Sequence, residues 1–428
     1  MGLFRLLPDF GMSYASTLEI SRDRKLAGRL VSNLLGFQAI LSALTLALCL
    51  GLGAQLFQGV TWTAVIVLSV DLVLKVVKST LRFLLKSLER FGTEAVSLLI
   101  ERGLILGLAL AALLGGHGVV GFVLVFVCVR LFDTTGLFLY VHRRILPLRL
   151  AADRALWKQL LRKGLPFAYA GVMILLFFQV DQVLLEQMRG PLEVGWYAAP
   201  VRVLEGLTLV PRIIGYALIP TMAALHPSAP ARVTALYARG SKYLLLAGLP
   251  ISAFGVLAAG PFVRFLFGDA YAPSAQAARL LIPAAAFMFL SSFGETTLAC
   301  INRWGAIVAI STACLALNVA LNLAWIPGYG YVGSAWATLL TEAFYFGSGA
   351  LALAAYGHSV GWLRLAARPL LATAVFAISL WTARELPLLW ASALASLAYG
   401  AATLALGVWD RKEWELLRGL LGRAHAAS

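Results

Sequence analysis

The chain has 428 residues, of which 61% are hydrophobic and 13% are charged, and its mean hydropathy is +0.85. A soluble domain cannot bury that much apolar surface, so the composition excludes a soluble globular protein. The net charge of +15 would suit nucleic-acid binding, but the basic residues gather in every second loop between apolar runs, which excludes that class and indicates a membrane protein.

A stretch at 3–20 comes before the first confident span. It is apolar, but Arg5, Pro8, Asp9 and Glu19 interrupt it, so it is too short and too polar to be a full span. It leads into a basic loop, as the end of a spanning helix would. We therefore expect it to be only the end of a helix.

Apolar runs of about 20 residues then recur along the whole chain, each long enough to cross a hydrocarbon core of about 30 Å as a helix. A helix satisfies its backbone hydrogen bonds internally, which lipid requires. The sequence thus predicts an all-α polytopic membrane protein with about twelve full spans. The predicted spans are 30–53, 56–77, 92–114, 119–141, 165–186, 196–221, 243–267, 275–301, 304–326, 332–355, 369–383 and 386–408.

The longest basic connection, 142–163, follows the fourth predicted span and divides the chain. It predicts an incomplete N-terminal lobe at 1–141, a linker at 142–163, a six-span C-terminal lobe at 164–356, and two further spans with a tail at 357–428. Trp157, Lys158 and Arg162 suit a helix lying on an anionic membrane surface, although basic residues here could equally serve only to set the topology.

Orientation follows from the same charges. Lys and Arg are concentrated in the loops before the first predicted span, after the second and after the fourth, and again in the C-terminal tail, whereas connections such as 115–118 and 328–331 carry almost none. Because basic loops stay on the inner side, we expect these loops and the C-terminus to be cytoplasmic.

Many ionisable residues fall inside the predicted spans, where a charge at mid-bilayer costs about 2.5–3.5 kcal/mol. Several are spaced to pair along one helix: Asp71 with Lys75, Arg130 with Asp133, and Arg202 with Glu205. They predict a polar cavity between two lobes, although paired charges could simply hold helices together. The candidate phosphate-binding cations are Arg202, Arg212, Arg130, Arg102 and Lys75, and the candidate coupling or cavity acids are Asp181, Glu205, Asp71, Asp133, Glu295 and Glu342.

The other motifs in the sequence give little information about function. Gly328, Gly330 and Gly333 spell G-x-G-x-x-G, but a turn between two spans is not the strand and soluble unit that a dinucleotide site needs. The four cysteines lie in apolar runs, and the five histidines are far apart. We expect no catalytic residues, no metal site and no cofactor.

Two stretches share a distinctive order of motifs. The first has Lys-Gly-x-Pro at 163–166, Asp181, Val-Gly-Trp-Tyr-Ala-Ala at 194–199, Arg202 and Pro220. The second, at 318–342, has an asparagine-rich span, Ile-Pro-x-Tyr-Gly and Gly-Ser-Ala-x-Ala-Thr. Together they resemble the oligosaccharide flippases of the multidrug/oligosaccharidyl-lipid/polysaccharide exporter superfamily.

The resemblance implies two helical lobes related by a pseudo-two-fold axis along the membrane normal, two extra C-terminal spans, and alternating access in a bacterial inner membrane. It implies an undecaprenyl-pyrophosphate-linked oligosaccharide as cargo, with proton or sodium coupling and polysaccharide polymerase or export machinery as further partners. Arg202 and Glu205 match in spacing an Arg-x-x-Glu of the related lipid II flippases. The family usually has fourteen spans, so we expect the chain to be N-terminally truncated.

Three alternatives stay open at this stage. A drug/cation antiporter of the same superfamily would favour acidic residues in the cavity, whereas the arginines favour an anionic cargo. A membrane glycosyltransferase or polymerase would be expected to carry a sizeable external loop, and the external loops at 187–195 and 268–274 are short. An inactive truncated paralogue is the third.

Overall fold

The structure is a computed structural model that describes residues 24–409, apart from 57–58, 89, 117 and 227, together with five positions between 12 and 20. The predicted partial helix at 3–20 therefore lies largely outside the described residues. Within the described part the secondary structure is helical, without strands. Its helices are η2 (Arg24–Leu26), α2 (Ala27–Leu56), α3 (Gly59–Ser87), α4 (Phe91–Leu114), α5 (Gly118–Arg144), α6 (Arg154–Arg189), α7 (Pro191–Leu207), α8 (Leu209–Leu225), α9 (Pro230–Phe267), η3 (Asp269–Tyr271), α10 (Ser274–Cys300), α11 (Trp304–Ala355), α12 (Trp362–Thr382) and α13 (Leu388–Ala405).

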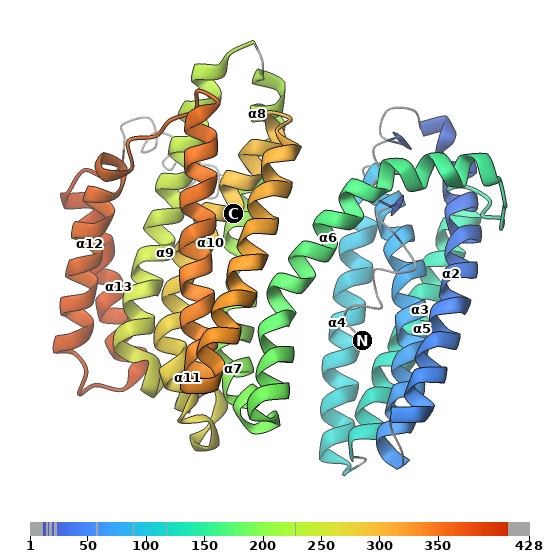
Figure 1. The fold of residues 1–428 in the computed structure, drawn as a ribbon, viewed down its shortest axis with the longest axis horizontal. Helices are drawn as coiled ribbons and strands as arrows, with labels where there is room; N and C mark the ends of the chain where they lie inside the picture. The colour runs from blue at the N-terminus through green and yellow to red at the C-terminus, as the bar shows by residue number, and fades with distance from the viewer. Residues whose placement is uncertain are drawn as a thin grey trace, which may run out of the picture. The chain divides into compact units, whose positions relative to one another are not determined.

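The helices follow the predicted spans closely, and the all-α polytopic fold is confirmed (Figure 1). By length and apolar composition, eight described segments are long enough to cross a membrane. One of them, the 52-residue α11, includes two predicted spans, and α7 and α8, of 17 residues each, share another. The number of twelve spans stays a prediction.

Two helices extend well beyond their predicted spans. Helix α3 continues past Val77 to Ser87, because its polar residues there are buried against neighbouring helices instead of entering a loop. Helix α6 begins at Arg154, inside the predicted linker, so that the non-helical part of the connection is only 145–153. The lobes and linker predicted from the charge pattern stay predictions.

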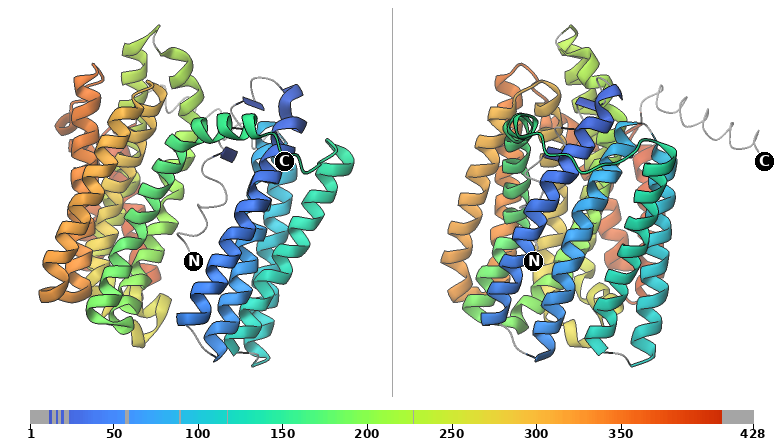
Figure 2. Two further views of the ribbon diagram at one scale, coloured as in Figure 1. Left: turned by 45° about the vertical axis from the view of Figure 1, so that its right-hand side comes forward. Right: turned by 90° about the vertical axis from the view of Figure 1, so that its right-hand side faces the viewer.

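The chain divides into two compact units, Met1–Leu175 and Leu176–Ser428. In unit 1, α2, α3, α4 and α5 run alongside one another in all views (Figures 1 and 2). Leucines from α2, α3 and α5 form its apolar core, together with Leu148 and Leu160 from the α5–α6 region. The core thus lies toward one end of the bundle and leaves the middle of α3 to polar side chains.

The connection between α5 and α6 is fixed onto α2. The backbone N–H of Asp153 donates to Asn33 Oδ1 at 2.7 Å, and Trp157 Nε1 donates to the carbonyl of Asn33 at 2.9 Å. A Cβ at Gly36 would lie 2.1 Å from the carbonyl oxygen of Ala151, so glycine is required for this approach. The start of α6 is therefore a defined part of unit 1.

Unit 2 is built around α9, α10 and α11. Its core includes fully buried Tyr237, Phe289 and Phe293, and Tyr197 of α7 joins it. The two C-terminal helices, α12 and α13, pack against α9 through Phe376, Ala391 and Ala395. This packing places the buried polar side chains of α6, α7, α10 and α11 within one unit.

A sharp turn interrupts α11 at Gly330, whose φ of 55° and ψ of −139° are non-helical. The predicted turn between two spans is therefore confirmed. Glu193 Oε2 accepts from the backbone N–H of Tyr331 at 2.9 Å, and Arg189 donates to the carbonyls of Ile326 and Pro327. The glycine motif thus forms a tight turn, which Arg189 at the end of α6 and Glu193 at the start of α7 hold in place.

Candidate functional site

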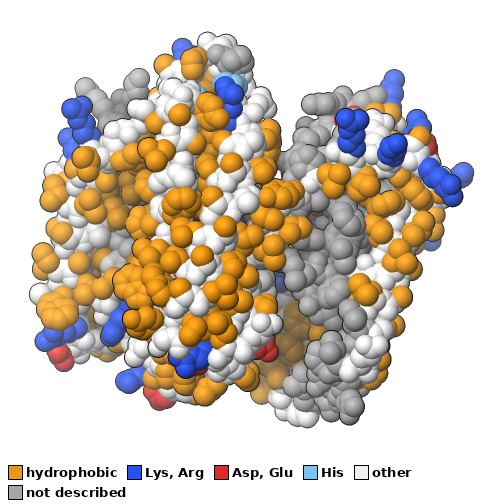
Figure 3. Space-filling view, viewed as in Figure 1, with side chains coloured by type: hydrophobic (Ala, Val, Ile, Leu, Met, Phe, Trp, Pro, Cys, Tyr) orange, Lys and Arg blue, Asp and Glu red, His pale blue; other side chains and the backbone are white. Residues whose placement is uncertain are grey.

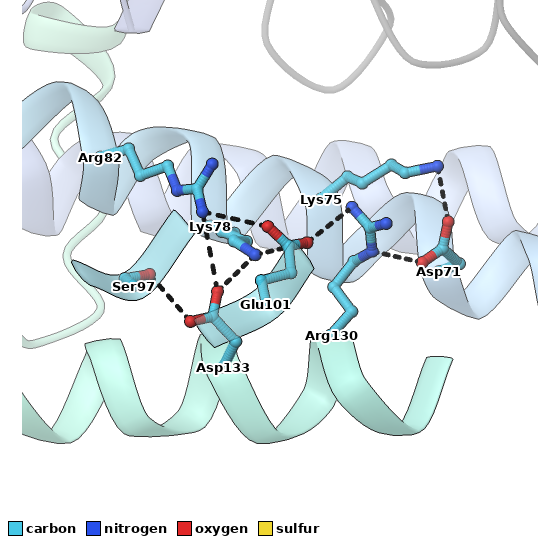
Figure 4. A network of polar contacts seen from close by, with 8 residues as sticks. All are labelled: Asp71, Lys75, Lys78, Arg82, Ser97, Glu101, Arg130 and Asp133. Atoms are coloured by element: carbon cyan, nitrogen blue, oxygen red, sulfur yellow. Dashed lines mark hydrogen bonds and ion pairs between the residues drawn. The ribbon is translucent and has the colours of Figure 1, made fainter. Parts of the chain in front are cut away.

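An ionic network occupies the space between α3, α4 and α5 in unit 1 (Figure 4). Its members form a chain of alternating charge across the three helices: Asp71, Lys75, Lys78, Arg82, Glu101, Arg130 and Asp133, with Ser97 at one end. All three carboxylates and Lys78 are buried, whereas the other cations are partly exposed.

Each carboxylate of the network lies within ion-pair or hydrogen-bond distance of more than one partner. Asp71 Oδ2 lies 2.6 Å from Lys75 Nζ, and Asp71 Oδ1 lies 2.6 Å from Arg130 Nε. Glu101 lies 2.7 Å from Lys78 Nζ and 3.1 Å from Arg82. Asp133 pairs with Lys78 and accepts from Ser97 Oγ at 2.8 Å. Such sharing offsets the desolvation that makes isolated buried charges unfavourable.

The ion pairs confirm one of the two pairs predicted for this region and show that the other is wrong. Asp71 and Lys75 pair as their spacing predicts. Arg130 does not pair with Asp133 three residues away on α5; it reaches Asp71 and Glu101 on the neighbouring helices instead. The reason is that α3 and α4 supply buried partners that cross the bundle, and spacing along one helix cannot reveal these.

Lys78 and Arg82 are network residues that the hydropathy pattern does not reveal, because both lie beyond the predicted span at 56–77. The Lys78 side chain is only 4% exposed and lies between two carboxylates from different helices. A signal was present in the sequence: Asp71, Lys75, Lys78, Arg82 and Lys86 recur every three or four residues and so share one face of a helix.

A pocket of about 390 Å³ opens beside this network. In the described part of the chain its lining holds six basic side chains and two acidic ones. The lining charges are Lys75, Lys78, Arg82, Lys86, Arg102 and Arg130 against Glu94 and Glu101. Three predicted phosphate-binding cations, Lys75, Arg102 and Arg130, are therefore brought together in one pocket.

The other two predicted cations belong to unit 2. Arg202 Nη1 donates to Glu205 Oε2 at 2.7 Å, as the spacing predicts, and its side chain is 63% exposed. Arg212, on α8, is also exposed. Between these two arginines the helix is interrupted at Thr208, which separates α7 from α8. Pro200 is accommodated within α7, and Pro211 falls in the first turn of α8, where proline is tolerated.

Three predicted acids of unit 2, Asp181, Glu295 and Glu342, bind hydroxyl groups. Tyr197 OH donates to the buried carboxylate of Asp181 and lies 2.9 Å from Thr338 Oγ1, so α6, α7 and α11 meet there. Glu342, also buried, accepts from Ser291 Oγ at 3.2 Å, and Glu295 accepts from Tyr345 OH at 2.9 Å.

These acids differ from those of unit 1 in lacking cationic partners within the described residues. The ion pairs in the described part of unit 2 join Arg202 to Glu205, Arg264 to Asp269 and Arg384 to Glu385. A buried carboxylate without a cation is unfavourable in its ionised form. Among the described residues, no three His, Cys, Asp or Glu side chains are grouped to hold a metal ion.

Residues 1–226 match the model of a family described as polysaccharide biosynthesis protein. No curated protein matches the sequence. The fold is similar to that of the lipid II flippase MurJ in an inward closed conformation, with a TM-score of 0.75 and 11% identity over 94% of this chain and 89% of that chain.

Two further solved structures are similar. One is an inward-facing multidrug resistance MATE family transporter of the MOP superfamily, with a TM-score of 0.67 and 15% identity over 83% of this chain and 88% of that chain. The other is a MOP superfamily transporter from Pyrococcus furiosus, described as having a binding pocket of reverse polarity, with a TM-score of 0.63 and 15% identity over 83% and 86% of the two chains. At these identities the likeness shows a common fold.

Proposed function

Because the chain belongs to the polysaccharide biosynthesis protein family, we propose that it is a flippase that moves an undecaprenyl-pyrophosphate-linked oligosaccharide across a bacterial inner membrane. By alternating access, the cargo would pass from the inner to the outer leaflet. Polysaccharide polymerase or export machinery would receive it there. The protein would act as a transporter and would need no cofactor.

The observation that carries this proposal is the basic pocket inside an otherwise apolar helical unit. Six cations line it against two carboxylates among the described residues. A pyrophosphate carries negative charge on several oxygens, and guanidinium groups can bond two phosphate oxygens at once. An excess of cations in a partly desolvated pocket is therefore suited to the pyrophosphate of a lipid-linked sugar.

The cations differ in how available they are for a ligand. Lys78 is bound to two carboxylates and is almost fully buried, so it serves the network. Lys75, at 35% exposure, and Arg82, at 19%, remain partly accessible, and Arg102 is exposed. We assign the phosphate contacts to Lys75, Arg82 and Arg102, with Arg130 behind them. Arg202 and Arg212 remain proposed cargo contacts from unit 2.

The pocket lies toward the basic end of unit 1. Its α3 residues run from Lys75 to Lys86, in the second half of that helix, and its α4 residues from Glu94 to Arg102, in the first half. Both segments adjoin the basic α3–α4 connection, which the charge pattern assigns to the cytoplasm. This position supports loading of the cargo from the inner leaflet.

The hydroxyl-bound acids of unit 2 are the proposed coupling groups. Asp181, Glu295 and Glu342 lack a cationic partner among the described residues, so neutralisation by a proton or a sodium ion would stabilise them. The same observation favours the second candidate function, a drug/cation antiporter, in which these acids would bind a cationic drug.

A reconstituted assay tests the proposal. Full-length protein is placed in liposomes with a polyprenyl-pyrophosphate oligosaccharide that carries a fluorophore, and an impermeant quencher reports the fraction of probe in the outer leaflet. We expect the protein to accelerate movement of this probe, and Lys75→Gln with Arg102→Gln to slow it. Arg264→Gln, an exposed arginine outside the pocket, serves as the matched control.

The same liposomes separate the two candidate functions. A flippase moves the pyrophosphate-linked probe and leaves a cationic dye in place, whereas an antiporter expels the dye when a proton or sodium gradient is applied. Movement of the dye alone, abolished by Glu342→Gln and unaffected by the pocket variants, would contradict the flippase proposal.

A further inference from the structure

The first turns of α6 carry a basic face in unit 1. Arg154, Lys158 and Arg162 follow one another at intervals of four residues, and all three are exposed. At a rise of about 1.5 Å per residue, successive cations stand about 6 Å apart along one side of the helix. Figure 3 shows Lys and Arg side chains over this start of α6.

The opposite side of the same turns is buried. Leu160 is 2% exposed within the core of unit 1, and Trp157 packs edge-on against Phe37 of α2 with ring centroids 5.3 Å apart. Together with the bond from Trp157 to the Asn33 carbonyl, these contacts fix the rotation of the helix. The basic face is therefore held outward in a set orientation.

The segment that carries this face has a single acidic residue of its own. Between 142 and 163 the sole carboxylate is Asp153, and it is occupied by Arg29 Nη2 at 2.9 Å and by the backbone N–H groups of Ala155 and Leu156 at 3.1 Å. The last turn of α5 adds exposed Arg143 and Arg144, and the connection adds exposed Arg149, next to which Leu150 is 75% exposed.

We propose that this surface, formed by Arg149, Leu150, Arg154, Lys158 and Arg162, is a binding site for the head groups of anionic phospholipids. Its cations are spaced along one side of a fixed helix, and its exposed leucine suits the boundary between head groups and acyl chains. The surface adjoins the start of α2 and the end of α5, two helices long and apolar enough to span a membrane. For this reason we assign a lipid, and not a soluble phosphate, as its ligand.

The site has a consequence for the transporter because of where α6 leads. The helix starts in unit 1 and continues past Leu175 into unit 2. Lipid bound to its first turns would stabilise their attachment to α2. Bound anionic lipid would then restrict the movement of α6, the helix that runs from unit 1 into unit 2. This effect does not depend on which cargo is carried.

The test measures lipid retention. The purified full-length protein is titrated with phosphatidylglycerol or phosphatidylcholine, and bound lipids are counted by native mass spectrometry. Each surface cation contributes roughly a fivefold gain in affinity for an anionic surface. The variant with Arg154→Gln, Lys158→Gln and Arg162→Gln is therefore expected to bind phosphatidylglycerol about 100-fold more weakly and phosphatidylcholine equally well.

The control removes the same charge elsewhere. Arg264→Gln, Arg279→Gln and Arg384→Gln replace three exposed arginines of unit 2 and are expected to leave retention of phosphatidylglycerol nearly unchanged. Equal losses in the two triple variants, or equal binding of both lipids by the unaltered protein, would overturn the proposal. So would displacement of the lipid by inorganic phosphate at millimolar concentration, because the site would then be one for soluble phosphates.

Discussion

The ammonium group of Lys78 on α3 lies 2.7 Å from the carboxylate of Glu101 on α4, and both side chains are at most 5% exposed. Lys78 also pairs with Asp133 on α5, so one side chain joins three helices. An ion pair in such a position stabilises little compared with apolar packing, but losing one partner leaves a buried charge uncompensated.

We predict from this arrangement that Lys78→Met destabilises the protein by roughly 3–5 kcal/mol, because Glu101 and Asp133 would lose a shared cation. Lys75→Met, at a side chain that is 35% exposed, should destabilise far less. Thermal unfolding of both variants in the same detergent provides the measurement. Equal melting temperatures for the two variants would show that Lys78 is not a central cation of the network.

A second prediction concerns cargo affinity. Arg102 lines the pocket, is exposed, and has no ion pair among the described residues, so its replacement should leave the fold intact. A charge-assisted hydrogen bond contributes about 1.5–3 kcal/mol, and Arg102→Gln should therefore raise the KM for the pyrophosphate-linked probe about tenfold or more. Arg384→Gln, at an exposed arginine outside the pocket, should leave KM unchanged. A normal KM for Arg102→Gln would remove this residue from the cargo site.

The sequence predicted the helices of this fold well because apolar runs of spanning length have few other solutions. It also located Asp71, Arg130 and Asp133 as intramembrane charges. It did not reveal how they pair, since spacing along a helix defines neighbours on that helix only, and the partners of Arg130 come from α3 and α4. Pairing across helices depends on how the bundle packs.

Lys78 illustrates a different limit. The apolar run ends near Val77, but α3 continues for about three more turns, and basic side chains of these turns line the pocket. The helical period of its charges was the available signal, and hydropathy alone concealed it. Hydroxyl partners such as Tyr197 for Asp181 were equally hidden, because tyrosine near a span end is usual at membrane interfaces.

The turn in α11 gives a third prediction. Gly330 has a positive φ, and a Cβ placed there would lie 2.2 Å from Glu193 Oε2. Gly330→Ala should therefore destabilise by at least about 1–2 kcal/mol from the backbone alone, and it should also displace Glu193 from the N–H of Tyr331. Gly328→Ala is the matched control, since that position is helical with open space around it and should be neutral or stabilising. Similar melting temperatures for both alanine variants would contradict the role assigned to this turn.

The last prediction uses pH to test how the start of α6 is attached to α2. The hydrogen bond from Arg29 and that from the backbone N–H of Leu156 hold the pKa of Asp153 below its usual value. A lowered pKa in the folded state means that the ionised form stabilises the fold. This stabilisation is present above the unfolded pKa of about 4 and is lost as the pH falls through the folded pKa.

Asp153→Asn keeps a side-chain oxygen for the helix start but removes the charge. Its melting temperature should therefore be lower than that of the unaltered protein by a constant amount between pH 6 and 8, and the difference should shrink below about pH 4 as the aspartate is protonated. Arg29→Gln should show the same pH pattern, and adding it to Asp153→Asn should change little, because the two residues share one interaction. A difference that grows on acidification, or effects of the two substitutions that simply add, would mean that the pair does not hold the helix in place.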